Sequence, residues 1–168
     1  DRGCGKQTIG VDSQNTSATR NYAQDTTMNF VRISDADFNL DTISWVTPRL
    51  AVTDMYGAQS VVRKVDCYVI NTAREINSPC DYKLAVTPFL VSREAVRAVL
   101  DTLADVIHKQ IETTENKVFV HCFAGMERSV LTCVWYLCKH HRMSMDEAYK
   151  AVRKVRPVAL DRREWAVG

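Results

Sequence analysis

The feature that most constrains the fold is a short apolar run that leads through a tight turn into a long apolar segment. The run KVFVHC, residues 117–122, has the length and composition of a buried strand. After Arg128, the segment SVLTCVWYLCKHH indicates a mostly buried helix. A buried strand that feeds directly into a buried helix is typical of α/β proteins, in which helices cover both faces of a parallel sheet.

Other parts of the chain repeat this alternation of strands and helices. Three further apolar runs predict strands, namely RLAVTD at 49–54, DCYVINTA at 66–73 and YKLAVTP at 82–88. An apolar stripe at helical spacing predicts a helix over 92–111, with Ser92 as its N-cap. Ser144 and Glu147 have the capping-box spacing and predict a helix over MDEAYKAVRKV, and Pro157 ends this helix or lies just beyond it. We therefore expect a three-layer α/β fold with a mainly parallel central sheet of about five strands flanked by helices.

The chain is expected to form one domain preceded by a tail. Its 168 residues are enough to bury roughly 70% of the surface that the unfolded chain would expose, so one core suffices. Residues 1–27 are polar with few large apolar side chains, and we expect a flexible N-terminal tail to which we assign no function. Residues 28–168 then form the folded domain.

Composition and charge exclude several classes of protein. With 46% hydrophobic and 25% charged residues the chain is not disordered, and a net charge of +2 gives no support to binding of nucleic acid or an anionic membrane. No apolar stretch approaches the roughly 20 residues that span a bilayer, and the polar N-terminus lacks the apolar part of a signal peptide. The six cysteines lack the spacing of a metal site. We therefore expect a cytoplasmic protein, with the nucleus as the alternative, that needs no metal and no membrane partner.

The turn after the 117–122 run, HCFAGMERSV at residues 121–130, is the candidate functional motif. A cysteine followed six residues later by an arginine is weak evidence, since six cysteines and 14 arginines give a chance expectation of about one half. Requiring a histidine before the cysteine and a glycine three residues after it lowers that expectation by a factor of about a thousand. The motif is also expected at the carboxyl edge of the sheet, where α/β proteins bind ligands.

Each residue type in this motif suits phosphate chemistry. The amides of a loop that curls around one point, together with the positive end of the following helix, bind an anion and favour the nucleophilic thiolate form of Cys122. Arg128 supplies a planar, two-pronged donor for two phosphoryl oxygens. Gly125 allows a positive φ or close approach of the ligand, Ser129 is expected to donate to the departing sulfur, and His121 to orient the loop. The phosphate-binding loop comprises Phe123, Ala124, Gly125, Met126, Glu127 and Arg128.

The segment HCFAGMERS matches the HCxxGxxRS signature of cysteine-dependent protein phosphatases, and the chain most resembles the small, single-domain dual-specificity branch. The similarity extends from about Ile43 to Trp165, through ISWVTPRLAVTD, VDCYVINTA and MDEAYKAVRKVRPVA. The resemblance implies a two-step hydrolysis without metal or cofactor, in which Cys122 becomes phosphocysteine, Arg128 binds the phosphate and water releases it. It also implies phosphorylated proteins as substrates, with a shallow pocket that admits phosphoserine and phosphothreonine as well as phosphotyrosine.

Two positions depart from the family pattern. Val130 stands where the family usually has proline, a change that the start of a helix tolerates. The general acid is the more serious departure, because the family generally carries an aspartate in the loop before the long helix, and here that loop is TPFLVSRE at 87–94. Proton donation to the leaving group is typically worth about 10² to 10⁴ in rate. The candidates to replace the aspartate are Asp161, Glu127, Glu94 and Asp81.

Three alternatives stay open. The missing aspartate favours a pseudophosphatase-type module that binds phosphorylated partners, whereas the intact Cys122, Arg128 and Ser129 favour an enzyme. A disulfide from Cys67 or Cys80 to Cys122 would provide redox control if the fold brings either within reach. A cationic run motivates RNA 5′ ends or inositol phosphates as substrates, although a solvated helix face is the commoner explanation. That run comprises Lys150, Arg153, Lys154, Arg156, Arg162 and Arg163.

Overall fold

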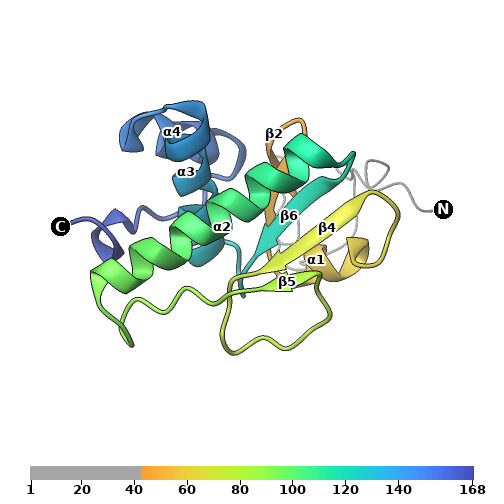
Figure 1. The fold of residues 1–168 in the computed structure, drawn as a ribbon, viewed down its shortest axis with the longest axis horizontal. Coiled ribbons are helices and arrows are strands. Elements are labelled where there is room, and N and C mark those ends of the chain that lie inside the picture. The colour runs from red at the N-terminus through yellow and green to blue at the C-terminus, as the bar shows by residue number, and fades with distance from the viewer. Residues whose placement is uncertain (1–42) are drawn as a thin grey trace.

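The computed structural model describes residues 43–168, so the predicted tail at 1–27 and the first part of the predicted domain, 28–42, lie outside the described residues. Its centre is a five-stranded sheet in the order β2-β3-β6-β4-β5 (Figure 1). β2 runs antiparallel to β3, and all other neighbouring strands are parallel. The strands are β2 (Ser44–Thr47), β3 (Leu50–Thr53), β4 (Cys67–Asn71), β5 (Tyr82–Lys83) and β6 (Lys117–His121).

Helices cover both faces of the sheet, which gives three layers and confirms the predicted fold class (Figure 1). They are α1 (Met55–Val61), α2 (Arg93–Thr113), α3 (Arg128–His141), α4 (Met145–Val155) and the short 3₁₀ helix η2 (Arg163–Trp165). Successive strand residues point to opposite faces, so Val52 and Val120 pack with α2, α3 and α4, while Ala51 and Phe119 pack with α1. No helix between residues 43 and 168 is long and apolar enough to cross a membrane.

Most elements lie where the sequence predicted them. β3, β4 and β6 fall inside three of the predicted apolar runs, and α2 extends the predicted 92–111 helix by two residues. The hydroxyl of Ser92 accepts a hydrogen bond from the backbone amide three residues later, at 3.1 Å, which confirms the predicted N-cap. Ser144 and Glu147 form both bonds of a capping box at the start of α4. α4 ends two residues before Pro157, because the residue before a proline avoids the helical conformation.

The strand at 82–83 and helix α1 differ from the prediction, and β2 and η2 lie outside the predicted ranges. The run 82–88 pairs as a strand only at Tyr82–Lys83, so the predicted strand was too long. Beyond it, the amides of Leu84 and Val86 donate to the backbone at the carboxyl end of β4, at 3.1 and 3.0 Å, but β4 itself ends there and offers no further ladder. Helix α1 was not predicted, because it has only seven residues and contains Gly57, a poor helix former that obscures any helical periodicity.

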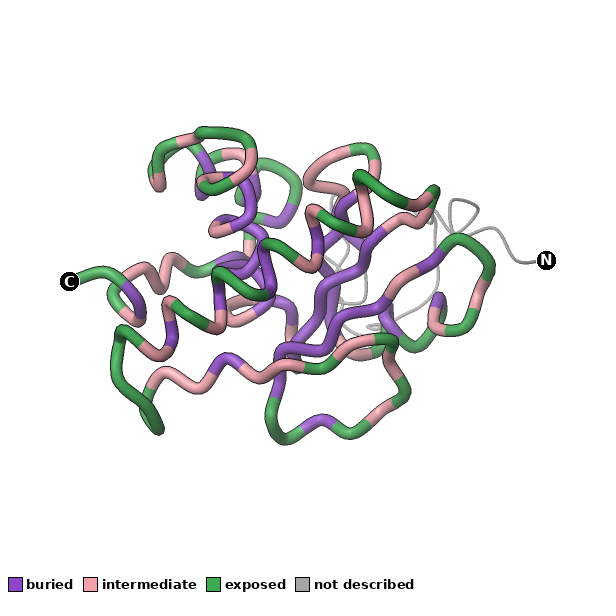
Figure 2. The backbone as a smooth tube through the Cα atoms, in the orientation of Figure 1, coloured by how far each residue is buried: buried purple, intermediate pink, exposed green. Residues whose placement is uncertain are grey.

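Three strand ends meet where the HCFAGMERSV loop begins. Thr53 of β3 and Asn71 of β4 are both register partners of His121, the last residue of β6. The carboxyl ends of parallel strands share one edge of the sheet, which is the edge where α/β folds bind ligands. These three strands are almost entirely buried (Figure 2), so the loop starts from the centre of the core.

Candidate active site

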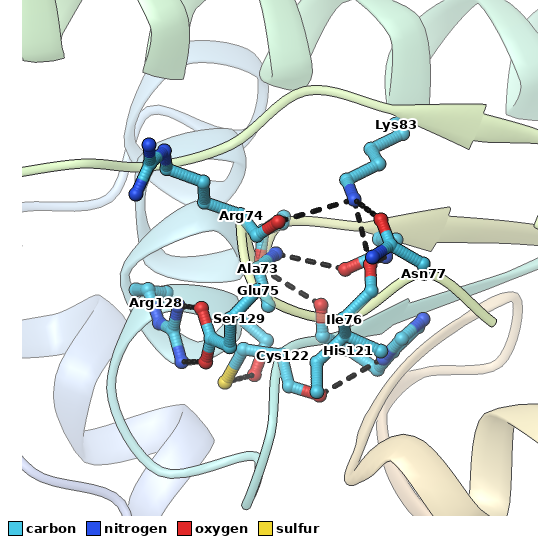
Figure 3. Close-up of polar contacts among 12 residues, drawn as sticks. Ala73, Arg74, Glu75, Ile76, Asn77, Lys83, His121, Cys122, Arg128 and Ser129 are labelled. Carbon is cyan, nitrogen blue, oxygen red and sulfur yellow. Dashed lines mark hydrogen bonds and ion pairs between the residues drawn. The ribbon is translucent and has the colours of Figure 1, made fainter.

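Cys122 follows β6 directly, and its thiol is almost enclosed by protein. The residue is 2% exposed and lies in a small cluster with Ala73, Ile76 and Met55. Its Sγ lies 3.2 Å from the Oγ of Ser129 in the first turn of α3 (Figure 3). A hydroxyl in this position is a hydrogen-bond donor for a sulfur that carries negative charge. The fold therefore brings the two side chains together although six residues separate them in the sequence.

The loop between Cys122 and α3 turns its carbonyl groups outward. The carbonyls of Phe123 and Met126 accept hydrogen bonds from the amides of Met55 (3.1 Å) and Leu160 (2.9 Å), and the two carbonyls between them accept from an arginine side chain. Because the peptide unit is planar and trans, the N–H after each carbonyl points the opposite way. Within residues 43–168 these amides have no protein acceptor. The loop thus presents a run of N–H donors at the amino end of α3, an arrangement that binds anions.

Arg156 is the buried cation that holds the centre of this loop. Its Nε donates to the carbonyl of Gly125 at 2.7 Å, and its Nη2 to the carbonyl of Ala124 at 3.2 Å. Its Nη1 donates to the hydroxyl of Ser44 at 3.0 Å. Gly125 has a φ of +69°, and a β-carbon there would come within 2.7 Å of both Arg156 and the carbonyl of Thr53, so only glycine fits. Arg156 is fully buried and is not the exposed charge that the cationic-run interpretation requires.

Arg128 opens α3 and forms a two-pronged ion pair with Glu75. Its two Nη atoms each donate to one carboxylate oxygen of Glu75 at 2.7 Å (Figure 3). These hydrogen bonds lower the pKa of Glu75 to about 2 and raise the pKa of Arg128. The guanidinium is therefore held in one orientation by a partner 53 residues away in the sequence. Sequence reasoning missed Glu75, because nothing in its local pattern points to the motif.

The loop that carries Glu75 is fixed by side chains of the sheet. Lys83 Nζ donates to the carbonyl of Ile76 at 2.6 Å and to the side-chain oxygen of Asn77 at 3.0 Å (Figure 3). The side-chain amide of Asn71, at the end of β4, donates to the same carbonyl of Ile76 at 2.7 Å. β4 and β5 therefore hold Glu75 in place to meet Arg128.

His121 is fully buried and faces away from the ligand side of the loop. Its Nδ1 lies 2.9 Å from the carbonyl oxygen of Cys122, and because a carbonyl only accepts, Nδ1 carries the proton. Burial lowers the pKa of His121, which keeps the ring neutral. Its Nε2 has no hydrogen-bond partner within the described part of the chain. The side chain orients the backbone around Cys122 and is not placed to move protons in the pocket.

A cavity of about 880 Å³ lies beside Arg128. One wall is the loop before α2, Thr87–Leu90, and another is formed by Arg162, Glu164 and Trp165 near the C-terminus. Cys122 does not line this cavity, and its side chain is almost fully buried. The volume is in the range of pockets that bury most of a small ligand, so there is room for a side chain and the groups that flank it.

Of the four candidate acids, Glu127 alone lines this cavity. Its carboxylate is bound to Arg162, whose Nε lies 2.8 Å away. Glu94 is 79% exposed in its side chain, and its ion-pair partner Arg97 is 3.9 Å away on the same helix. Glu94 therefore lies in solvent near the start of α2.

The two aspartate candidates are both engaged elsewhere. Asp161 binds Arg163 in a two-pronged contact, with its Oδ2 2.7 Å from Nη2, and also accepts from the Arg163 backbone amide at 3.0 Å. Asp81 accepts from the backbone amide of Val69 in β4 at 2.8 Å. Neither lines the cavity beside Arg128. The structure thus does not bring these two carboxylates to the site.

The candidate redox partners do not lie beside Cys122. Cys67 begins β4, four residues before the register partner of His121, which corresponds to about 13 Å along the strand. That separation exceeds the reach of a disulfide to Cys122. Cys80 packs against the same cluster as Cys67 and not against Cys122. Across residues 43–168, no group of three or more His, Cys, Asp or Glu side chains is placed to hold a metal ion.

The family model and the curated relatives that match this chain point to the same family. Residues 57–165 match the family model described as dual specificity phosphatase, catalytic domain. The chain is 36% identical over 99 residues to Dual specificity protein phosphatase 14 of Mus musculus. The aligned region covers 57% of this chain and 49% of that protein. It is 30% identical over 99 residues to Dual specificity protein phosphatase 18 of Homo sapiens. Here the aligned region covers 59% of this chain and 50% of that protein. The chain therefore spans about half the length of the curated relatives it matches.

Solved structures share the same fold. Human DUSP28 superposes with a TM-score of 0.60 at 21% identity, over 73% of this chain and 86% of that chain. The human tyrosine phosphatase-like serine/threonine/tyrosine-interacting protein superposes with a TM-score of 0.61 at 17% identity, over 74% of this chain and 90% of that chain. Because the family model matches well over half of its residues, this chain belongs to the dual specificity phosphatase family.

Proposed function

We propose that this chain is a cysteine-dependent phosphatase that hydrolyses phosphotyrosine and phosphoserine/threonine on proteins through a phosphocysteine intermediate. The observation that carries the proposal is the position of the Cys122 sulfur. It lies 3.2 Å from the Ser129 hydroxyl, at the start of a loop whose carbonyls at 123–126 are all bonded outward. An anion held by the loop amides lies next to this sulfur.

In the first step, the Cys122 thiolate attacks phosphorus. A sulfur–phosphorus bond forms, the ester phosphorus–oxygen bond breaks, and the leaving oxygen takes up a proton. Arg128 stabilises the charge on the transferring group. A guanidinium has five N–H donors, and Glu75 occupies only two of them, so the others can bind phosphoryl oxygens while the ion pair holds the orientation.

In the second step, water attacks phosphorus and the sulfur–phosphorus bond breaks. The products are inorganic phosphate and the regenerated thiolate, and the proton of the attacking water passes to the base that served as acid in the first step. The Ser129 hydroxyl donates to the sulfur as negative charge returns to it.

Protein substrates fit the charges around the site better than RNA 5′ ends or inositol phosphates do. Arg156 of the cationic run is buried, Arg162 is paired with Glu127, and Arg163 is paired with Asp146 and Asp161. The other three members of the run are exposed on α4 and do not line the cavity. Three glutamates and four arginines line the cavity, together with apolar residues of the loop before α2. A mixed wall of this kind disfavours a polyanion and suits a polypeptide.

A phosphate-binding module without turnover is the second candidate, and the specific observation in its favour is that loop 87–94 contains no aspartate. One assay distinguishes the phosphatase from the phosphate-binding module. Purified protein and Cys122→Ser are compared on an activated aryl phosphate, whose leaving group needs little help from an acid. The enzyme is expected to release phosphate at a rate that Cys122→Ser reduces by at least about 10³. Equal rates for the two proteins would rule out the proposed activity.

A further inference from the structure

The loop that borders the cavity before α2 has no side chain that can donate a proton to a leaving group at neutral pH. Pro88, Phe89 and Leu90 line the cavity, and the last two are 84% and 66% exposed. The loop continues through Val91 into α2. If proton transfer occurs in this site, the carboxyl group must come from a neighbouring segment.

The segment 164–166 is attached directly to that loop. The rings of Phe89 and Trp165 meet edge to face, with centroids 5.7 Å apart. Arg93, the first residue of α2, donates its Nε–H to the backbone carbonyl of Glu164 at 3.0 Å. Arg97, one turn later, donates to the backbone carbonyl of Ala166 at 2.7 Å. These contacts from both the loop and α2 hold the backbone of Glu164 at the cavity.

Three glutamates line the cavity, and two of them form ion pairs with arginines. Glu75 binds Arg128 through both oxygens at 2.7 Å, and its pKa is about 2, so it stays ionised. Glu127 binds Arg162 at 2.8 Å. The carboxylate of Glu164 makes no ion pair or hydrogen bond within residues 43–168, because its contact with α2 uses the backbone carbonyl.

We propose that Glu164 is the catalytic residue that protonates the leaving group in this chain. The proposal rests on the phosphatase activity proposed above. As the ester bond breaks, the Glu164 carboxyl group gives its proton to the departing serine, threonine or tyrosine oxygen and becomes a carboxylate. In the second step the same carboxylate takes a proton from the attacking water while the Cys122 sulfur leaves, so each turnover consumes one water and returns both groups to their starting states.

The test compares the wild-type protein with Glu164→Gln on phosphate monoesters whose leaving groups range from an acidic nitrophenol to the serine of a phosphopeptide. An acid matters most for the poorest leaving group. The expected loss in kcat/KM is about 100-fold or more for the phosphoserine peptide and within about threefold for the nitrophenyl ester.

Glu94→Gln is the matched control, because it removes a glutamate that is exposed near the same end of α2 but does not line the cavity. It is expected to leave the leaving-group dependence unchanged. A Glu164→Gln protein that loses the same factor on every ester, or loses nothing on the phosphoserine peptide, would overturn the assignment of Glu164. That result is separate from failure of the proposed function, in which the wild-type protein and Cys122→Ser would hydrolyse the nitrophenyl ester at equal rates.

Discussion

The guanidinium of Arg156 donates its Nε–H to the carbonyl oxygen of Gly125 over 2.7 Å, across 31 residues of sequence. This contact ties the residue after α4 to the middle of the phosphate-binding loop. It also explains why the loop amides are left to a ligand, since the carbonyls of Gly125 and Ala124 are already bonded on the other side. The shape of the anion site therefore depends on Arg156, a buried cation that binds the loop carbonyls and does not contact the anion itself.

Replacement of Arg156 by methionine is expected to lower both stability and phosphate binding. Two buried loop carbonyls lose their donor, so the free energy of unfolding should fall by roughly 2–5 kcal/mol. Urea unfolding measures the change. Arg153→Met, at an exposed position of α4, is the matched control and should shift the free energy of unfolding by less than about 0.5 kcal/mol. An Arg156→Met protein as stable as the control would contradict the role of this arginine as a clamp.

The Arg128–Glu75 ion pair makes the free energy of unfolding depend on pH in the acidic range. Its hydrogen bonds lower the pKa of Glu75 from 4.5 to about 2. A carboxylate with a lowered pKa stabilises the fold above its ordinary pKa, and that contribution is lost as the pH falls from about 4.5 toward about 2. The effect is modest, because the Glu75 side chain is 53% exposed and solvent screens the pair.

Urea unfolding at a series of pH values tests this dependence. The free energy of unfolding of the wild-type protein should decline between pH 4.5 and about 2 more steeply than that of Glu75→Gln, which has no proton to bind at this position. Parallel declines for the two proteins would show that the ion pair with Arg128 does not contribute to stability.

Ser129→Ala is expected to slow the breakdown of the phosphocysteine more than its formation. The Ser129 hydroxyl lies 3.2 Å from the sulfur that must leave in the second step. Loss of a hydrogen bond to a charged group costs about 1.5–3 kcal/mol, which corresponds to about 10- to 150-fold in rate. Stopped-flow measurements with an activated aryl phosphate should therefore show a burst of phenol close to one per enzyme, followed by slow turnover. A uniform slowing of burst and turnover would contradict this role.

Local sequence patterns were sufficient for most of the fold. Capping residues such as Ser92 and Ser144, and apolar runs such as 117–122, act over a few residues, so their elements could be located without knowledge of their partners. The run 82–88 was misjudged, because the length of a strand depends on how far its neighbour continues. Helix α1 was missed for a different reason, since seven residues around Gly57 carry too little periodicity to detect.

The site was predictable only where it is continuous in the sequence. The loop from Cys122 to Ser129 is one segment with a specific spacing, whereas its supports lie far away in the chain. Glu75 approaches from 53 residues before Arg128, and Arg156 from 31 residues after Gly125. An arginine beside a basic helix has the same local pattern whether it is exposed or buried, so burial of Arg156 depends on tertiary structure alone.

The most direct test of the mechanism is to trap the covalent intermediate. The protein is mixed with an aryl phosphate, quenched in acid within milliseconds, digested and analysed by mass spectrometry, with Ser129→Ala included to increase the trapped fraction. The expected result is a phosphoryl group on the peptide that contains Cys122 and none in Cys122→Ser. Phosphate release at the wild-type rate by Cys122→Ser, or turnover with no phosphoryl group on Cys122 in either protein, would contradict a phosphocysteine mechanism.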